Sequence, residues 1–134
     1  TSYFSVDGFG RPVSATSFDG ATRSWSIEQD PETGLRTLEE SSFTGERTVS
    51  IRDRFDRELR AGVLGMDGAW RYADQRYDVL GRLVAQSVPH RDGEAAPERT
   101  LTYDGLDRVT QERLPDGVVL RNEYNGFFIF FYFI

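Results

Sequence analysis

Cysteine is absent from the 134-residue chain, and histidine occurs once, at His90. Without cysteine, neither a disulfide framework nor a thiolate metal site can form. With one histidine, any His-mediated triad would have to be built around His90, which lies in the Pro-, Gly- and charge-rich segment 89–97. Such a composition is typical of an exposed loop. We therefore expect His90 to be a solvated loop residue without a catalytic role.

An excess of positive charge is also lacking. The chain has 16 basic and 22 acidic residues, a net charge of −6, and no stripe of basic residues interleaved with aromatic ones. Because phosphate neutralisation supplies most of the affinity for nucleic acid, this composition argues against a nucleic-acid partner.

The motifs of phosphate and calcium sites are missing as well. No Gly-rich phosphate-binding loop is present, and no segment has the dense Asp and Asn ligands of a calcium loop. Acidic pairs such as Asp53 with Asp56 and Asp104 with Asp107 could suggest metal ligation or acid–base catalysis, but turn formation explains the same residues. We predict no enzymatic activity, no catalytic residue, no metal and no cofactor.

Long apolar runs are absent except at the end of the sequence. The segment Phe127–Ile134 holds six of the 18 aromatic residues and is too short to span a bilayer. It is either a genuine strand lying against an apolar interior or a sequence foreign to the natural protein, and its abrupt composition favours the second interpretation. Nothing at the start resembles a signal peptide. We expect the chain to be a piece of a longer protein.

What the chain does contain is an internal repeat. The segment Tyr77–Arg82 recurs 26 residues later as Tyr103–Arg108. Aligning on an aromatic or apolar residue followed by Asp, with Arg four positions after the Asp, predicts further copies at Val6-Asp7 with Arg11 and at Phe55-Asp56 with Arg60. Degenerate copies are predicted at Ile27-Glu28, followed by a longer loop at 30–34, and at Tyr124-Asn125. The repeat units therefore start near residues 6, 27, 55, 77, 103 and 124.

Most units also carry a second turn signal before the next one begins. These signals are Asp19-Gly20, Thr44-Gly45, Asp67-Gly68, Asp92-Gly93 and Asp116-Gly117. Two turns and two short apolar runs in each unit predict one β-hairpin per repeat.

In the first turn of each unit, Asp can accept backbone hydrogen bonds, and the positive φ angle three residues later suits Gly10, Gly81 or Asp107. Arg in the following position could bridge back to the Asp. Leu59 does not fit this pattern, so a different turn type or a bulge is expected in the unit near residue 55.

Apolar and polar residues alternate in the predicted strands. Val118, Leu120 and Tyr124 share one face of their strand, while Arg121 and Glu123 share the other. The same spacing relates Trp25 to Ile27, Val49 to Ile51, Trp70 to Tyr72 and Leu101 to Tyr103. We predict an all-β fold over residues 1–126, in which consecutive antiparallel hairpins form a curved or spiral sheet with one packed face and one solvated face.

The repeated motif carries a family resemblance. At Tyr77-Asp78-x-x-Gly81-Arg82-Leu83 and Tyr103-Asp104-x-x-Asp107-Arg108-Val109, followed by Pro115-Asp116-Gly117, the chain resembles the Rhs or YD-repeat family over residues 3–126. The resemblance implies a spiral of β-hairpins wound into a hollow shell. In bacterial polymorphic toxins and toxin complexes such a shell encloses a C-terminal toxin, and in animal teneurins it belongs to an adhesion ectodomain.

On this resemblance we expect a non-catalytic shell segment whose partners are the remainder of the same shell and an enclosed toxin cargo. The parent protein would be secreted or delivered to a target cell. The self-cleaving aspartyl segment of bacterial shells has only a faint echo in residues 30–35, so catalysis is not carried over. The alternative is an adhesion module in which exposed Trp25, Trp70 and tyrosines bind a glycan or a cell-surface protein.

Overall fold

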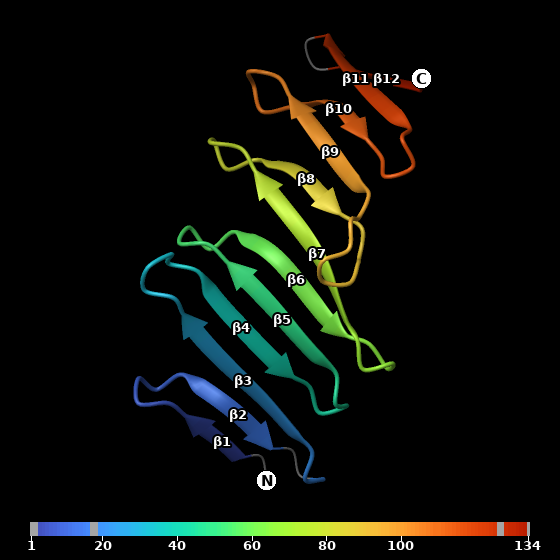
Figure 1. Cartoon of the computed structure of the whole chain (residues 1–134). Helices are drawn as coiled ribbons and strands as arrows, with labels where there is room; N and C mark the ends of the chain where they lie inside the picture. Colours follow the sequence, from blue (N-terminus) through green and yellow to red (C-terminus); the bar gives the residue numbers. More distant parts are fainter. Residues whose placement is uncertain (1–2, 17–18, 126–127, 134) are drawn as a thin grey trace. The chain divides into compact units, whose positions relative to one another are not determined.

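The computed structural model describes residues 3–16, 19–125 and 128–133, with the backbone alone at residues 3, 4, 12 and 128–133. All regular elements in these ranges are β-strands (Figure 1). In chain order they are β1 (Tyr3–Val6), β2 (Pro12–Thr16), β3 (Thr22–Gln29), β4 (Arg36–Ser41), β5 (Arg47–Arg52), β6 (Glu58–Leu64), β7 (Trp70–Tyr77), β8 (Leu83–Ser87), β9 (Glu98–Tyr103), β10 (Val109–Arg113), β11 (Val119–Asn125) and β12 (Phe128–Phe133). A membrane-spanning helix is not found in this part of the chain.

The strands belong to two units, Thr1–Tyr72 and Ala73–Ile134, and β7 contributes residues to both. In the first unit, β1 to β6 pair antiparallel in sequence order. In the second unit, the end of β7 pairs with β8, and the pairing continues in order to β12. Each unit is an open antiparallel sheet built from consecutive hairpins, which confirms the predicted all-β hairpin fold.

The hairpin turns after β1, β5, β7 and β9 share one backbone geometry. In the β7–β8 turn, the N–H of Asp78 donates to the carbonyl of Arg82 and the N–H of Gly81 donates back to the carbonyl of Asp78, both at 3.0 Å. Gly81 has a φ of 84°. The turn is a three-residue hairpin loop whose last residue lies in the left-handed region. It is accompanied by a bulge, because the pairing of β7 with β8 shifts register between Arg76 and Tyr77.

Two turns differ from their predicted positions. The turn after β5 is built on Asp53 and Arg57, with Asp56 at a φ of 66°, so the prediction that Asp56 pairs with Arg60 is wrong. Asp56 takes the left-handed position, so the turn type is the same as in the other three turns. The predicted bulge is present, because the register shifts between Ile51, which pairs with Arg60, and Arg52, which pairs with Glu58, and leaves Leu59 as the extra residue. The turn after β3 starts at Asp30, because Ile27 and Glu28 lie inside the strand and pair with Leu38 and Thr37. That loop is one residue longer than the turns after β1, β5, β7 and β9, as predicted for residues 30–34.

Neither sheet has a deep interior among the described side chains. Only Ala15, Gly62, Ala85 and Ser87 are buried. In β11, Leu120 and Tyr124 are half-buried while Arg121 and Glu123 are exposed, so the predicted alternation is present there. Val118, which was predicted on the packed face, lies before the strand and is exposed. The apolar face is only partly covered, and stability therefore has to come largely from cross-strand pairs and turns.

The aromatic tail forms β12, which pairs with β11 from Leu120 opposite Phe133 to Asn125 opposite Phe128. Tyr124 and Asn125, where a degenerate copy of the repeat is predicted, are the last two residues of β11. Residues 126 and 127 lie outside the described residues.

Candidate functional site

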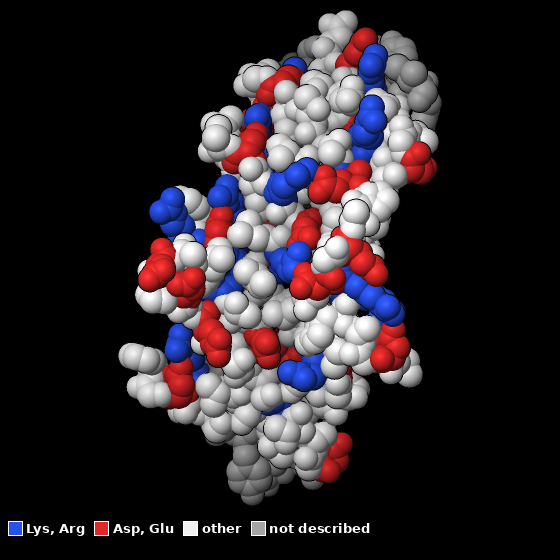
Figure 2. Space-filling model, viewed as in Figure 1, with Lys and Arg blue, Asp and Glu red and all other residues white. Residues whose placement is uncertain are grey.

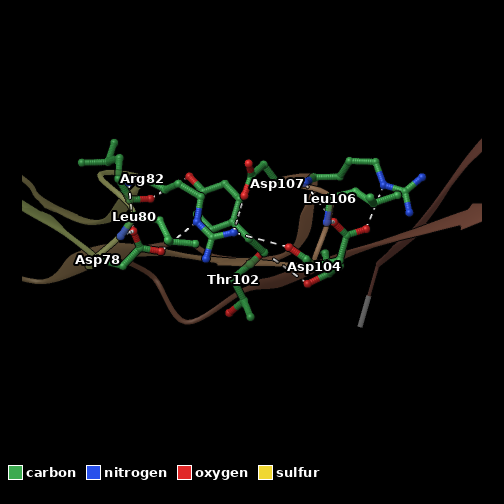
Figure 3. Close-up of polar contacts among 11 residues, drawn as sticks. Asp78, Leu80, Arg82, Thr102, Asp104, Leu106 and Asp107 are labelled. Atoms are coloured by element: carbon green, nitrogen blue, oxygen red, sulfur yellow. Dashed lines mark hydrogen bonds and ion pairs between the residues drawn. The ribbon is translucent and has the colours of Figure 1, made fainter.

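The recurring structural element of this chain is the aspartate that opens the hairpin turns after β1, β5, β7 and β9. At Asp78, Oδ1 accepts hydrogen bonds from the N–H groups of Leu80 at 2.9 Å and Arg82 at 3.0 Å. Oδ2 accepts from Nε of the Arg82 side chain at 2.8 Å. Asp104 repeats the arrangement with Leu106 and Arg108 (Figure 3). One carboxylate thus satisfies two backbone donors and fixes one guanidinium.

The first unit contains the same turn. Asp7 accepts from the N–H groups of Phe9 and Arg11 and from Nε of Arg11, and Asp53 does so with Phe55 and Arg57. The shared pattern is Asp, any residue, an apolar residue, Gly or Asp, then Arg. An ion pair from Arg back to the turn Asp is therefore present in all four turns. It confirms the bridges predicted at Asp7, Asp78 and Asp104, whereas the pair of Asp53 with Arg57 was not predicted.

These contacts stabilise the ionised carboxylates. Hydrogen bonds from the N–H of Arg82 and then from its side chain lower the pKa of Asp78, although partial burial opposes the shift. The pKa of Asp104 is lowered in the same way by the N–H of Arg108. At Asp53, burial raises the pKa, but the hydrogen bonds from Arg57 and Phe55 outweigh it and the pKa is lowered. The turns are consequently built to hold charged aspartates.

In the second unit, the turn arginines also reach the next hairpin. The guanidinium carbon of Arg82 lies 4.7 Å from the ring centroid of Tyr103, and that of Arg108 lies 4.4 Å from Tyr124. Both distances are within the range of cation–π attraction.

Each of these tyrosines returns a hydrogen bond to the previous hairpin. The hydroxyl of Tyr103 donates to the carbonyl of Leu83, and that of Tyr124 to the carbonyl of Val109, both at 2.7 Å. Leu83 and Val109 directly follow Arg82 and Arg108 in the sequence. Asp, Arg and the next Tyr therefore form a clamp between successive hairpins, which we call the Asp–Arg–Tyr clamp.

A second ion pair joins neighbouring turns where Asp replaces Gly at the left-handed position. Nη1 of Arg82 lies 2.7 Å from Oδ1 of Asp107 (Figure 3). Nη2 of Arg36 lies 2.5 Å from Oδ1 of Asp56. Asp107 and Asp56 are the non-glycine residues with positive φ in the described part of the chain. At both places the substituted aspartate holds an arginine of the preceding hairpin.

The turns also present apolar side chains to solvent. The residue two positions after the turn aspartate is Phe9, Phe55, Leu80 or Leu106, and 67 to 88 % of its surface is exposed. Its N–H is held by the aspartate, so its backbone position is fixed.

The tryptophans named in the adhesion alternative are half-buried, not free. The guanidinium of Arg23 lies 5.3 Å from the Trp25 ring, and that of Arg47 lies 5.9 Å from the Trp70 ring. Trp70 also stacks against Tyr72 with centroids 6.1 Å apart. A shallow hollow of about 480 Å³ beside Trp25 is lined by serine, glutamate and arginine side chains.

Charges of both signs alternate over the visible surface (Figure 2). The described residues contain no group of three or more His, Asp or Glu side chains that could hold a metal ion. The acidic pair Asp53 and Asp56 lies within one turn, as does the pair Asp104 and Asp107.

His90 is not the solvated residue that the sequence predicts, because only 9 % of its side chain is exposed. It lies against Ser87 and Asp74, which are the residue types of a hydrolase triad. However, Nδ1 lies 3.0 Å from the carbonyl of Val88, which can only accept, so Nδ1 carries a proton. That nitrogen cannot then take a proton from Ser87, and the serine is itself buried.

Sequence reasoning missed Asp53 because it required an aromatic or apolar residue before the turn aspartate, whereas Arg52 stands there. The apolar residue two positions after Asp, followed by Gly or Asp and then Arg, is the signal that would have found it. The contact between His90 and Asp74 joins residues of different elements, and no local pattern marks it.

Comparison with models of known protein families finds no match to this chain, and comparison with curated proteins finds none.

Proposed function

We propose that this chain is a non-catalytic structural segment of an Rhs or YD-repeat shell that encloses or presents a C-terminal toxin cargo. The observation that carries the proposal is the Asp–Arg–Tyr clamp, in which the motif residues Tyr, Asp and Arg join successive hairpins. Each motif residue contacts another residue of the repeat array. The role of these residues in joining the hairpins is therefore enough to explain why the motif recurs. The partners of this chain would be the rest of the shell and the cargo. The parent protein would be secreted or delivered to a target cell.

The adhesion alternative has weaker support. A ring that stacks on a sugar needs a free face, and an arginine of the chain lies over one face of each of Trp25 and Trp70. The hollow beside Trp25 is shallow and open.

The test is limited proteolysis of the natural protein, combined with peptide mapping of everything that follows this segment. A shell role predicts that the downstream region resists cleavage while the repeats are intact. Tyr103→Ala should make the repeats and the downstream region cleavable together, whereas a substitution at exposed Val79 should not. Cleavage of the downstream region at the same rate in all three proteins would contradict the proposal.

A further inference from the structure

Aspartate followed by glycine is the dipeptide in which aspartate most readily rearranges to isoaspartate. The nitrogen of the next residue has to reach Cγ of the aspartate, and glycine has no side chain to obstruct it. The chain contains six such pairs, which begin at Asp7, Asp19, Asp67, Asp92, Asp104 and Asp116. The sequence makes these pairs look alike, but the structure distinguishes two of them that lie in matching turns.

The turns between β6 and β7 and between β10 and β11 have the same backbone geometry. Each is closed by the same two backbone hydrogen bonds, at 2.8 to 3.0 Å. One bond uses the nitrogen of the glycine, since Gly68 donates to the carbonyl of Gly65 and Gly117 to that of Leu114. The φ angles are also similar, at 75° for Gly68 and 91° for Gly117. Both pairs therefore start from one main-chain conformation.

In the first of these turns, the carboxylate of Asp67 is held from two sides. Oδ1 accepts the N–H of Ala69 at 3.2 Å. The guanidinium of Arg71 donates to Oδ1 at 3.0 Å and to Oδ2 at 2.8 Å. These hydrogen bonds lower the pKa of Asp67, so the side chain is held in its ionised form.

In the second turn, the carboxylate of Asp116 has only the backbone contact. Oδ1 accepts the N–H of Val118 at 3.0 Å. Within the described part of the chain, no arginine lies within ion-pair distance of this carboxylate. Leu120 follows Asp116 by four residues, at the place where Arg71 follows Asp67. Asp116 is therefore exposed and lacks the cation that holds its counterpart.

The rearrangement begins with the neutral carboxylic acid. The nitrogen of Gly117 attacks Cγ of Asp116 and forms a C–N bond, and the proton of the nitrogen leaves with the hydroxyl group of the acid as water. Water then opens the resulting five-membered imide. Addition at the former main-chain carbonyl carbon gives isoaspartate, and addition at Cγ restores aspartate. An ion pair opposes the first step, because an ionised carboxylate has no hydroxyl group to lose.

We propose that Asp116 is a site of isoaspartate formation and that Arg71 protects Asp67 from the same change. A Cβ atom added at Gly117 would meet no atom within 4 Å, so the surroundings leave room for the imide ring. Isoaspartate adds one carbon atom to the main chain, directly before Val119 pairs with Arg113. The modification depends on the chemistry of this turn alone, and is independent of the shell proposal.

The test is incubation of the full chain in mildly acidic buffer, followed by tryptic peptide mapping. Cleavage after arginine places Asp116 in the peptide 114–121 and Asp67 in the peptide 61–71, each with a single aspartate. A protein-isoaspartate methyltransferase measures the product in each peptide, and an unincubated sample gives the background. Isoaspartate should form faster in peptide 114–121 by about fivefold or more, which is the factor expected for an ion pair.

Two variants exchange the residues that follow the aspartates. Arg71→Gln should raise the rate at Asp67 toward that at Asp116 and leave Asp116 unchanged, whereas Leu120→Arg should slow the reaction at Asp116. Equal rates in the two peptides of the wild type, or an unchanged rate at Asp67 in Arg71→Gln, would overturn the proposal. Arg71→Gln changes a side chain that is partly exposed, so it provides the comparison even if Leu120→Arg does not fold.

Discussion

At the residue scale, Asp107 combines two opposing effects. Its φ of 61° is costly for a residue with a Cβ atom, by about 1–2 kcal/mol, whereas an exposed ion pair such as that with Arg82 contributes about 0–1 kcal/mol. Asp in place of Gly at this turn position therefore lowers the stability of the fold or leaves it nearly unchanged. What the aspartate adds is an ion pair that joins two adjacent turns.

We expect Asp107→Gly to leave the free energy of unfolding unchanged or to raise it by about 1 kcal/mol, because relief of the backbone offsets the lost ion pair. Asp107→Ala keeps the strained backbone and loses the pair, so it should lower the free energy of unfolding by up to about 1 kcal/mol. Denaturant titration measures both. An alanine variant more stable than the glycine variant would contradict the assignment of strain.

Tyr103 tests the Asp–Arg–Tyr clamp. Tyr103→Phe removes only the hydroxyl that donates to Leu83 and should lower the free energy of unfolding by about 1 kcal/mol. Tyr103→Ala also removes the ring beneath Arg82 and should cost about 2 kcal/mol, less than the 3–5 kcal/mol typical of a fully buried aromatic side chain, because Tyr103 is half-buried.

Arg82→Gln provides the matched measurement. If the ring and the guanidinium interact, the loss caused by Tyr103→Ala should be smaller in the Arg82→Gln background than in the wild type. Additive losses in thermal or denaturant unfolding would show that the two side chains are not coupled.

At the element scale, Gly62 lets the ring of Tyr72 approach β6 closely. A Cβ added at Gly62 would lie 2.7 Å from Cγ1 of Val49 and 2.8 Å from two ring carbons of Tyr72. The guanidinium of Arg60 lies 4.9 Å from the Tyr72 ring. Glycine is required here by the close approach of a side chain, since its φ is not positive.

Gly62→Ala should lower the free energy of unfolding by about 1–3 kcal/mol, because either the Tyr72 ring or the strand has to move. In a Tyr72→Ala background much of the obstruction is gone, so the same substitution should cost clearly less. A double-mutant cycle measured by denaturant unfolding gives the coupling. Equal costs in the two backgrounds would place the obstruction at Val49 alone.

The elements differ in how far their sequence predicts them. Turn positions such as Asp78 to Arg82 are local, since all the hydrogen bonds of the turn lie within five residues, and these were predicted with their left-handed glycine. The position of the turn at Asp53 was not predicted, because the overlapping pairs Asp53 with Arg57 and Asp56 with Arg60 have the same spacing in the sequence. The clamp from Arg82 to Tyr103 and the burial of His90 join residues of different elements. They depend on how strands pair, which a local pattern does not specify.

At the scale of the whole molecule, both units rely on the same ionised carboxylates. The pKa values of Asp7, Asp30, Asp53, Asp67, Asp78 and Asp104 are all lowered by hydrogen bonds made in the folded state. In the unfolded chain an aspartate has a pKa of about 3.9. The unfolded state therefore binds protons first as the pH falls, which favours unfolding.

We expect the free energy of unfolding contributed by these groups to be fully present above about pH 4 and to decrease as the pH falls through the lowered values. Unfolding measured between pH 7 and pH 2 should show this loss in both units. Asp78→Asn should make the acid dependence shallower, and Asp78→Asn combined with Asp104→Asn should make it shallower still, because each substitution removes one of the groups that bind a proton on unfolding. Acid dependence of equal slope in the wild type and both variants would show that the turn carboxylates do not control the stability of the repeat array.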